Sequence, residues 1–143
     1  MKNISIYTDG SCLGNPGFGG YGAIILDSEK EITLKGGERE TTNNRMELRA
    51  IIESLRWVAS HCTGAQVHLF SDSNLFIQSI TKGWKRKKNV DLWEEFDEVL
   101  QATKQKKNEI EWTWVKAHAN NLYNIKVDRV AFAQSTKQKK LHE

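Results

Sequence analysis

The fold is decided by a stretch near the start of the chain, Ile4-Ser5-Ile6-Tyr7-Thr8-Asp9-Gly10-Ser11. Apolar and polar side chains alternate over residues 3–9, and β-branched residues are frequent, so this segment is predicted to be a strand that ends at Asp9. Residues 66–71 form a second apolar run of this kind, and Asp72 follows it directly. Two strands that each end in an acid are the first sign of a polar site at the edge of a sheet.

Glycine and proline mark the chain after this first strand. Six of the ten glycines lie between residues 10 and 22, and the only proline is there too. This composition predicts a turn over residues 10–20. A second strand is predicted over 21–26 and a third over 31–36, which together with the first make an antiparallel meander.

The clearest helix is predicted over residues 42–61. Its apolar residues recur at helical spacing, and Thr42 is a plausible N-cap. Asp91, with Glu94 three residues on, is predicted to cap a later helix. The remaining predicted elements are a buried strand at 66–71, a short helix at 73–81, a strand at 110–115 and a helix at 125–135. This order predicts an α/β fold with a five-stranded mixed sheet, three antiparallel strands followed by parallel ones, flanked by helices.

Composition favours one globular domain. The chain has 143 residues, with 38% hydrophobic and 27% charged, which is the size of a single domain with one core. We predict that the domain spans 1–143, with residues 136–143 as a basic, frayed tail. No segment approaches the roughly 18 apolar residues of a membrane span. Cys12 and Cys62 form neither a zinc motif nor a disulfide framework, so a reduced, cytoplasmic setting is expected. A monomer is also expected.

Charge is mild overall but unevenly distributed. The formal net charge is +3, too small by itself to indicate a polyanionic partner. Basic residues nevertheless gather over 82–88, around Trp84, and again at Lys137, Lys139 and Lys140. Such groups suit a polyanionic ligand, although a solvated face and a frayed tail are equally good interpretations of each group alone.

Four carboxylates fall at the ends or in the first turns of predicted elements: Asp9, Glu47, Asp72 and Asp128. Hard oxygen ligands from several elements are what Mg²⁺ or Mn²⁺ requires. Four of them can hold two ions about 3.5–4 Å apart, an arrangement that suits displacement at phosphorus. Each acid also has a plainer interpretation. Asp9 could form a turn, Asp72 could cap a helix, Glu47 could be a solvated first-turn acid that interacts favourably with the helix dipole, and Asp128 could be a surface acid on the last helix.

Five blocks of sequence follow one another along the chain. They are Tyr7-Thr8-Asp9-Gly10-Ser11 with its Gly-Asn-Pro-Gly turn, Thr41-Thr42-Asn43-Asn44-Arg45-Met46-Glu47-Leu48, Ser71-Asp72-Ser73, Lys88-Asn89-Val90-Asp91-Leu92-Trp93 and Trp114-Val115-Lys116-Ala117-His118-Ala119. In this order the blocks resemble type I ribonuclease H, the bacterial ribonuclease HI family, and the resemblance runs from about Lys2 to about Gln134.

The resemblance implies an endonuclease that hydrolyses the RNA strand of RNA–DNA hybrids. It implies two-metal-ion catalysis with Mg²⁺, or Mn²⁺ as a substitute, and products with 3′-hydroxyl and 5′-phosphate ends. Asp9, Glu47 and Asp72 would hold the ions, with Asp128 completing the second ion's shell. His118 would assist proton transfer and product release. Removal of replication primers, or of transcription-derived hybrids, would follow from the family alone.

The resemblance also implies a set of substrate contacts. The side-chain amides of Asn43 and Asn44 would reach 2′-hydroxyls and base edges in the minor groove. Thr42 with Asn89 would form a pocket for a DNA phosphate. Gly10 and Ser11 would let the RNA backbone approach. Trp57, Trp93, Trp112 and Trp114 are expected in the core. The full set of implied contacts is Gly10, Ser11, Asn15, Thr42, Asn43, Asn44, Asn74, Trp84 and Asn89.

The chain departs from the family's pattern in three places. The basic handle of many bacterial members is reduced to residues 81–88, which predicts fewer phosphate contacts and a raised KM. Around His118 the usual Gly, Pro and Glu are missing, which puts loop mobility and turnover in question. Glu40 stands where the family often has a basic residue, which would weaken the phosphate pocket.

Two alternatives to a stand-alone hybrid-specific ribonuclease remain at this point. One is a module of the same fold that binds hybrids or RNA without cutting them, which the altered loop around His118 favours. The other is a related nuclease, such as the ribonuclease H part of a reverse transcriptase or a transposase-like enzyme. Intact Asp9, Glu47 and Asp72 favour catalysis over binding alone.

Overall fold

The computed structural model describes residues 2–83, 86–116 and 121–143. The elements in chain order are β1 (Asn3–Gly14), β2 (Gly17–Asp27), β3 (Lys30–Thr41), α1 (Asn43–His61), β4 (Gln66–Ser71), α2 (Asn74–Lys82), α3 (Val90–Gln105), β5 (Glu109–Trp114) and α4 (Leu122–Leu141). Among the described helices, none combines the length and the apolar character that crossing a bilayer requires.

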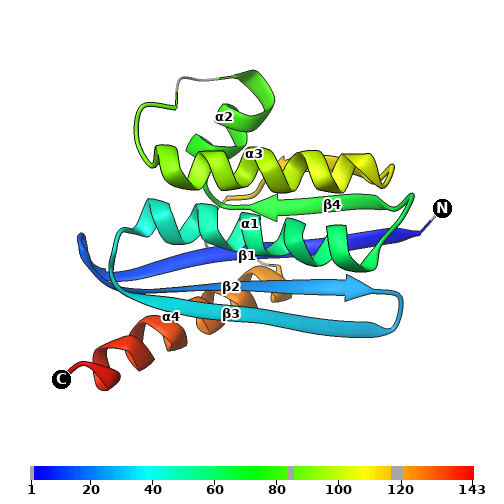
Figure 1. Ribbon diagram of the computed structural model, residues 1–143. Helices are drawn as coiled ribbons and strands as arrows, with labels where there is room; N and C mark the ends of the chain where they lie inside the picture. The colour runs from blue at the N-terminus through cyan, green and yellow to red at the C-terminus, as the bar shows by residue number, and fades with distance from the viewer. Residues whose placement is uncertain (1, 84–85, 117–120) are drawn as a thin grey trace.

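The five strands form one mixed sheet in the order β3-β2-β1-β4-β5. β1, β2 and β3 pair antiparallel, whereas β4 pairs parallel to both β1 and β5. The predicted architecture is therefore confirmed. In Figure 1, α1 and α3 lie together in front of the sheet, and α4 crosses it obliquely toward the C terminus.

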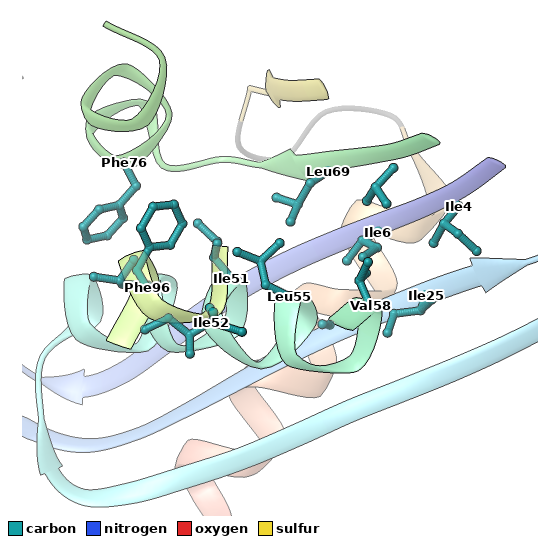
Figure 2. Close-up of a cluster of buried hydrophobic side chains, with 14 of the residues drawn as sticks. Ile4, Ile6, Ile25, Ile51, Ile52, Leu55, Val58, Leu69, Phe76 and Phe96 are labelled. Carbon is teal, nitrogen blue, oxygen red and sulfur yellow. The ribbon is translucent and has the colours of Figure 1, made fainter. Parts of the chain in front are cut away.

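The core lies between the sheet and α1 with α3. Isoleucines at positions 4, 6 and 25 point from the strands toward the apolar face of α1, where Ile51 and Leu55 are fully buried. Figure 2 shows these side chains meeting in one layer, with Phe76 and Phe96 closing its end. The apolar residues whose 3.6-residue periodicity predicts α1 are therefore those on the face that the helix buries in the core.

The glycine-rich segment is a β-hairpin and not the predicted turn over residues 10–20. β1 continues to Gly14 and β2 starts at Gly17, so that only Asn15 and Pro16 form the connection. The glycines are needed for close packing. A Cβ on Gly20, for example, would lie 2.4 Å from the backbone nitrogen of Ser135 in α4. In a sequence, clustered glycines normally indicate a flexible turn, whereas here Gly20 allows α4 to pack closely against the strand.

The C-terminal helix is longer than predicted. The helix was predicted over 125–135, whereas α4 runs from Leu122 to Leu141 and includes residues 136–141 of the predicted basic tail. The helix packs on the sheet far beyond residue 135, since the side chain of Gln138 lies against Gly37. The ring of His142 also stacks on Phe18, with a centroid distance of 6.2 Å. These long-range contacts hold turns that local sequence alone would leave frayed.

The N-terminus of α3 differs from the prediction as well. The residue at the N-cap position is Asn89, whose φ of 59° is left-handed, and its side chain makes no capping hydrogen bond. Asp91, the predicted cap, lies inside the helix and pairs with Arg45 of α1. By contrast, Thr42 caps α1 as predicted, because its side chain accepts a hydrogen bond from the Arg45 backbone N–H at 3.2 Å.

Candidate active site

The sheet brings Asp9 and Asp72 side by side. Asp72 follows the end of β4, whereas Asp9, predicted to end its strand, lies inside β1, which runs on to Gly14. The parallel pairing of β1 with β4 stops at Thr8 and Ser71, so the next residue on each strand is an aspartate. β4 ends there, and the chain turns away into α2, whose N-cap is Ser73. The pure-cap interpretation of Asp72 is therefore wrong. Carboxyl ends of adjacent parallel strands are a common location for ligand sites in α/β sheets.

Glu47 reaches the same point from the second turn of α1. The helix can approach because residue 10 has no side chain: a Cβ on Gly10 would lie 2.4 Å from the Glu47 backbone nitrogen and 2.6 Å from the Met46 carbonyl carbon. The sequence predicts that Gly10 admits the RNA backbone. In the structure, the backbone that approaches Gly10 is that of α1, and this contact fixes the position of Glu47 over the strand.

The three carboxylates form a compact, largely buried cluster. Oxygen atoms of Asp9, Glu47 and Asp72 all lie within 4.8 Å of one another. Asp9 and Glu47 are only 5% and 4% exposed. The Gly10 backbone N–H donates a 2.9 Å hydrogen bond to Asp9 Oδ1. Glu47 Oε2 is buried and has no hydrogen-bond partner among the residues that the structure describes.

Burial and mutual repulsion make it costly to charge these three groups together. Burial, followed by the charge of Asp72, raises the pKa of Asp9 to about 8. Burial likewise raises the pKa of Glu47 well above its ordinary value, with Asp9 and Asp72 adding to the effect. Burial is also the main cause that raises the pKa of Asp72. The cluster therefore takes up either protons or a positive ion.

A cavity of about 510 Å³ opens over the cluster. Asp128, predicted as the fourth acid, lies on α4 and lines this cavity, but it is not among the three residues whose oxygens lie within 4.8 Å. Lys116, Asn124 and Arg129 line it too, and the sequence prediction missed all three as site residues. The signals were available, since Lys116 follows the end of β5 and Asn124 lies one helical turn before Asp128. His118 lies outside the described residues.

The predicted phosphate pocket is organised by a residue that the prediction omitted, Arg45. Its guanidinium donates to Asn89 Oδ1 at 3.3 Å and to both oxygens of Asp91 at 2.9 and 2.7 Å. Its backbone N–H is bound by Thr42. The pairing with Arg45 lowers the pKa of Asp91 to about 2. Thr42 and Asn89, far apart in sequence, thus converge through one arginine.

The structure brings only some of the other predicted substrate contacts to the cavity. Asn43 lines the cavity, and its backbone N–H donates to the Asn15 side chain at 3.2 Å, so the structure brings these two together. Ser11 instead lies on the α4 side of β1, where its hydroxyl is 3.3 Å from that of Ser135. Asn44 and Asn74 are exposed at helix starts. Trp84 lies outside the described residues.

The prediction that Trp114 lies in the core is wrong. Trp93 is buried, and Trp57 and Trp112 pack against the core as expected, but the side chain of Trp114 is 48% exposed. Its indole N–H donates to the Asp72 carbonyl oxygen at 3.2 Å. Trp114 therefore holds the backbone of Asp72 where β4 ends.

The donor set fits divalent cations. Three carboxylates from three parts of the chain converge. One of their oxygens is buried without a partner among the residues that the structure describes, and their close contact is unfavourable unless the charge is compensated. A mixed sheet with a helix-borne glutamate over one aspartate inside β1 and one at the end of β4 defines a class, the α/β nucleases and phosphotransferases that use a carboxylate cluster to hold metal.

Comparison with known proteins identifies the family. The family model for RNase H matches residues 1–136. Ribonuclease HI of Campylobacter jejuni serotype O:2 is 48% identical over 139 residues, which cover 92% of this chain and 90% of the relative. The chain belongs to the ribonuclease H family, whose members are endonucleolytic hydrolases.

Solved structures of RNase H proteins have the same fold as this chain. The N-terminal RNase H domain of rv2228c from Mycobacterium tuberculosis superposes with a TM-score of 0.83 at 25% identity, and each chain is covered completely. LC11-RNase H1, solved in complex with an RNA/DNA hybrid, gives a TM-score of 0.71 at 25% identity, covering 94% of this chain and 97% of the other.

The raised pKa values predict how stability depends on pH. Because the folded-state pKa of Asp9 is about 8 rather than 3.8, the folded protein binds more protons than the unfolded chain between these values. The free energy of unfolding without metal should therefore fall as pH rises through this window. Thermal unfolding in EDTA from about pH 5 to about pH 8 measures this, since the Arg-paired acids Asp91 and Glu95, whose pKa values are lowered, lose their contribution only at lower pH.

Magnesium chloride should reverse the trend, because bound cation replaces the missing protons. At a concentration of about 100 times Kd it should stabilise the fold by roughly 2.7 kcal/mol. A melting temperature in EDTA that rises steadily over the same pH range would contradict the assignment of the cluster.

Proposed function

We propose that this protein hydrolyses the RNA strand of RNA–DNA hybrids, using two Mg²⁺ ions, with Mn²⁺ as a substitute, and leaving 3′-hydroxyl and 5′-phosphate ends. The observation that carries the proposal is the buried Asp9–Glu47–Asp72 cluster, in which one oxygen of Glu47 has no partner within the described ranges 2–83, 86–116 and 121–143. Membership of the ribonuclease H family supports the same substrate class, as does the hybrid seen bound to LC11-RNase H1.

In the proposed reaction, the protein's side chains bind the metal ions and position the scissile phosphate. Ions bound by the cluster would stabilise the leaving oxygen and lower the pKa of an attacking water. Asp9 and Asp72 are fixed by the sheet, and Glu47 by the close approach of α1 to Gly10, so the ligands are preorganised. Asp128, from α4, contributes a fourth carboxylate at the rim. Lys116 and Arg129 at the cavity wall would orient the scissile phosphate.

Hybrid recognition is proposed to come from the start of α1 and its neighbours. Asn43 offers an amide at the cavity edge, where it can reach a 2′-hydroxyl, the group that distinguishes RNA from DNA. Thr42 and Asn89, joined by Arg45, would bind a phosphate of the DNA strand. His118, as a proton-transfer residue, remains a prediction, as do the monomeric state, the cytoplasmic setting and a role in primer removal.

The decisive experiment is cleavage of an end-labelled RNA–DNA hybrid with Mg²⁺, beside single-stranded RNA, duplex RNA and duplex DNA. We expect cuts in only the RNA strand of the hybrid, abolished by EDTA and by Asp72→Asn. Full activity of Asp72→Asn would refute the metal-site assignment. Binding of the hybrid without cleavage in either Mg²⁺ or Mn²⁺ would instead indicate the non-cleaving module.

Arg45 provides a test of the phosphate pocket. Arg45→Lys keeps the positive charge but loses the paired hydrogen bonds to Asp91 and the contact to Asn89. We expect KM for the hybrid to rise several-fold while kcat stays within about twofold, because the carboxylates are untouched. Arg56→Lys, which breaks a comparable surface pair with Glu95 away from the cavity, is the matched control. A fall in kcat at constant KM would contradict this role.

A further inference from the structure

The outer face of α4 is basic and continuous with the candidate active site. α4 contains five basic residues and one acid, Asp128. Helical spacing places four of the basic residues, Lys126, Arg129, Lys137 and Lys140, on the side opposite the buried Val127, Ala131 and Ser135. All four are exposed. We call these four residues the α4 basic row.

Three hollows connect the row to the carboxylate cluster. Ile125 and Arg129 line both the active-site cavity and a second hollow beside α4. Ala133 lines this second hollow and a third one, which reaches Lys137 and Lys140. Shared lining residues therefore link the hollow over Asp9, Glu47 and Asp72 to the last turns of α4, which Figure 1 shows crossing the sheet obliquely.

Most of the basic row carries uncompensated charge. Lys126 pairs with Glu31 of β3. For Arg129, Lys137 and Lys140, no ion pair occurs among residues 2–83, 86–116 and 121–143. Neighbouring Lys139 points to another side of the helix and lies 3.8 Å from Glu143. Unneutralised cations along a groove that starts at a phosphate-cleaving site match the charge of a nucleic-acid backbone.

We propose that the α4 basic row binds backbone phosphates of the substrate duplex beyond the cleavage site, and so partly replaces the shortened basic handle. This inference rests on the proposed function. From Arg129 to Lys140 the helix spans about 16 Å, at about 1.5 Å per residue. That length corresponds to about five phosphates of one strand at about 3.4 Å per base pair. Only substrates that extend several base pairs past the cavity would reach Lys137 and Lys140.

Exposed apolar side chains make an acidic protein segment the competing occupant. Leu122 and Phe132 are 71% and 55% exposed and flank the row. The connection of the three hollows favours a nucleic acid over a protein segment. A ligand that lies along these hollows would enter the cavity that contains the carboxylates. A protein segment has no chemical reason to end there, whereas a strand being cut must pass through it.

The test uses the double variant Lys137→Gln/Lys140→Gln with hybrids of two lengths. The short hybrid just spans the cavity, and the long hybrid extends about 12 base pairs on both sides, beyond the reach of the row. For the long hybrid, the slope of log K against log salt should become less negative by about 2, since each lost phosphate contact contributes about 0.9. KM for the long hybrid should rise about fivefold to tenfold at low salt, with kcat unchanged.

The short hybrid and a control variant make the result specific. KM and kcat for the short hybrid should not change. Lys107→Gln removes an exposed lysine before β5, at the sheet edge opposite Asp72, and should leave the salt slope unaltered. An unchanged slope in the double variant, an equal effect on both hybrids, or an equal effect of Lys107→Gln would each overturn the proposal and leave the groove to another ligand, such as an acidic protein segment.

Failure of the proposed function would look different. If the wild-type protein did not cleave even the short hybrid, the assigned reaction would be wrong. The salt slope for binding of the long hybrid would still decide whether the α4 basic row contacts phosphates.

Discussion

Asp9→Asn is expected to lower hybrid cleavage by at least about a thousandfold, the scale on which removing a central electrostatic group acts, and at the same time to stabilise the fold. The amide cannot supply the charge that holds a cation between the strand ends. It does keep the oxygen that accepts the Gly10 N–H. Because burial and Asp72 raise the pKa of Asp9 to about 8, charging this group is unfavourable in the folded state at neutral pH.

Removing that charge should raise the free energy of unfolding by roughly 1–3 kcal/mol near pH 7 without metal, on the scale of about 1.4 kcal/mol for each pKa unit. Thermal unfolding in EDTA and single-turnover cleavage in Mg²⁺ measure the two effects on one sample. The stabilisation should disappear near pH 4, where the wild-type carboxylate is also protonated in the folded state.

Asp97→Asn is the matched control for this prediction. It makes the same chemical change at an exposed acid that pairs with Arg86 at 2.7 Å. Activity should be retained, and stability should fall slightly, by about 0–1 kcal/mol, as for other surface pairs. If Asp9→Asn were destabilised in EDTA, or cleaved at the wild-type rate, Asp9 would not belong to a strained, metal-binding cluster.

Gly10→Ala is expected to have the second large effect. The new Cβ would lie 2.4 Å from the Glu47 nitrogen and 2.6 Å from the Met46 carbonyl carbon. Both are backbone atoms, so no side-chain rotation relieves the clash, and the start of α1 must move. We expect a loss of about 2–4 kcal/mol of stability. Displacing Glu47 by about 1 Å should lower cleavage by about a hundredfold.

Gly64→Ala separates displacement of the site from a general cost of replacing glycine. Gly64 has a φ of +68°, and nothing lies within 4 Å of an added Cβ. That variant should lose about 1–2 kcal/mol through its left-handed backbone conformation but cleave normally. Equal activity losses in the two variants would refute the special role of Gly10. Near-normal stability and activity of Gly10→Ala would refute the proposed function of the contact.

Much of the fold and the centre of the site could be predicted from the sequence. Strand periodicity gave β1 and β4, helical periodicity gave α1, and both signals are strong because each element buries one face in the core. Asp72 was recognisable as a strand-end acid and Glu47 as an acid early in α1, whereas Asp9, predicted to end its strand, lies inside β1. The resemblance to the ribonuclease H family joined these separate signals.

Other features depended on contacts between distant segments. The hairpin over residues 10–20 was predicted as a turn because glycine normally signals flexibility, yet Gly10 and Gly20 are required by helices packed against the strands. The last helix was predicted to stop near residue 135, yet α4 runs on to Leu141, where Gln138 lies against Gly37 of β3.

The sequence by itself determined the order of the elements, the apolar faces that make the core and the three acids of the central cluster, since local periodicity and strand ends are encoded by neighbouring residues. Only the tertiary structure decided that Arg45 joins Asn89 and Asp91, that Trp114 holds Asp72 and that the α4 basic row continues the cavity. Each of these pairs residues separated by tens of positions, and burial, charge and helix packing act on distance in space and not along the chain.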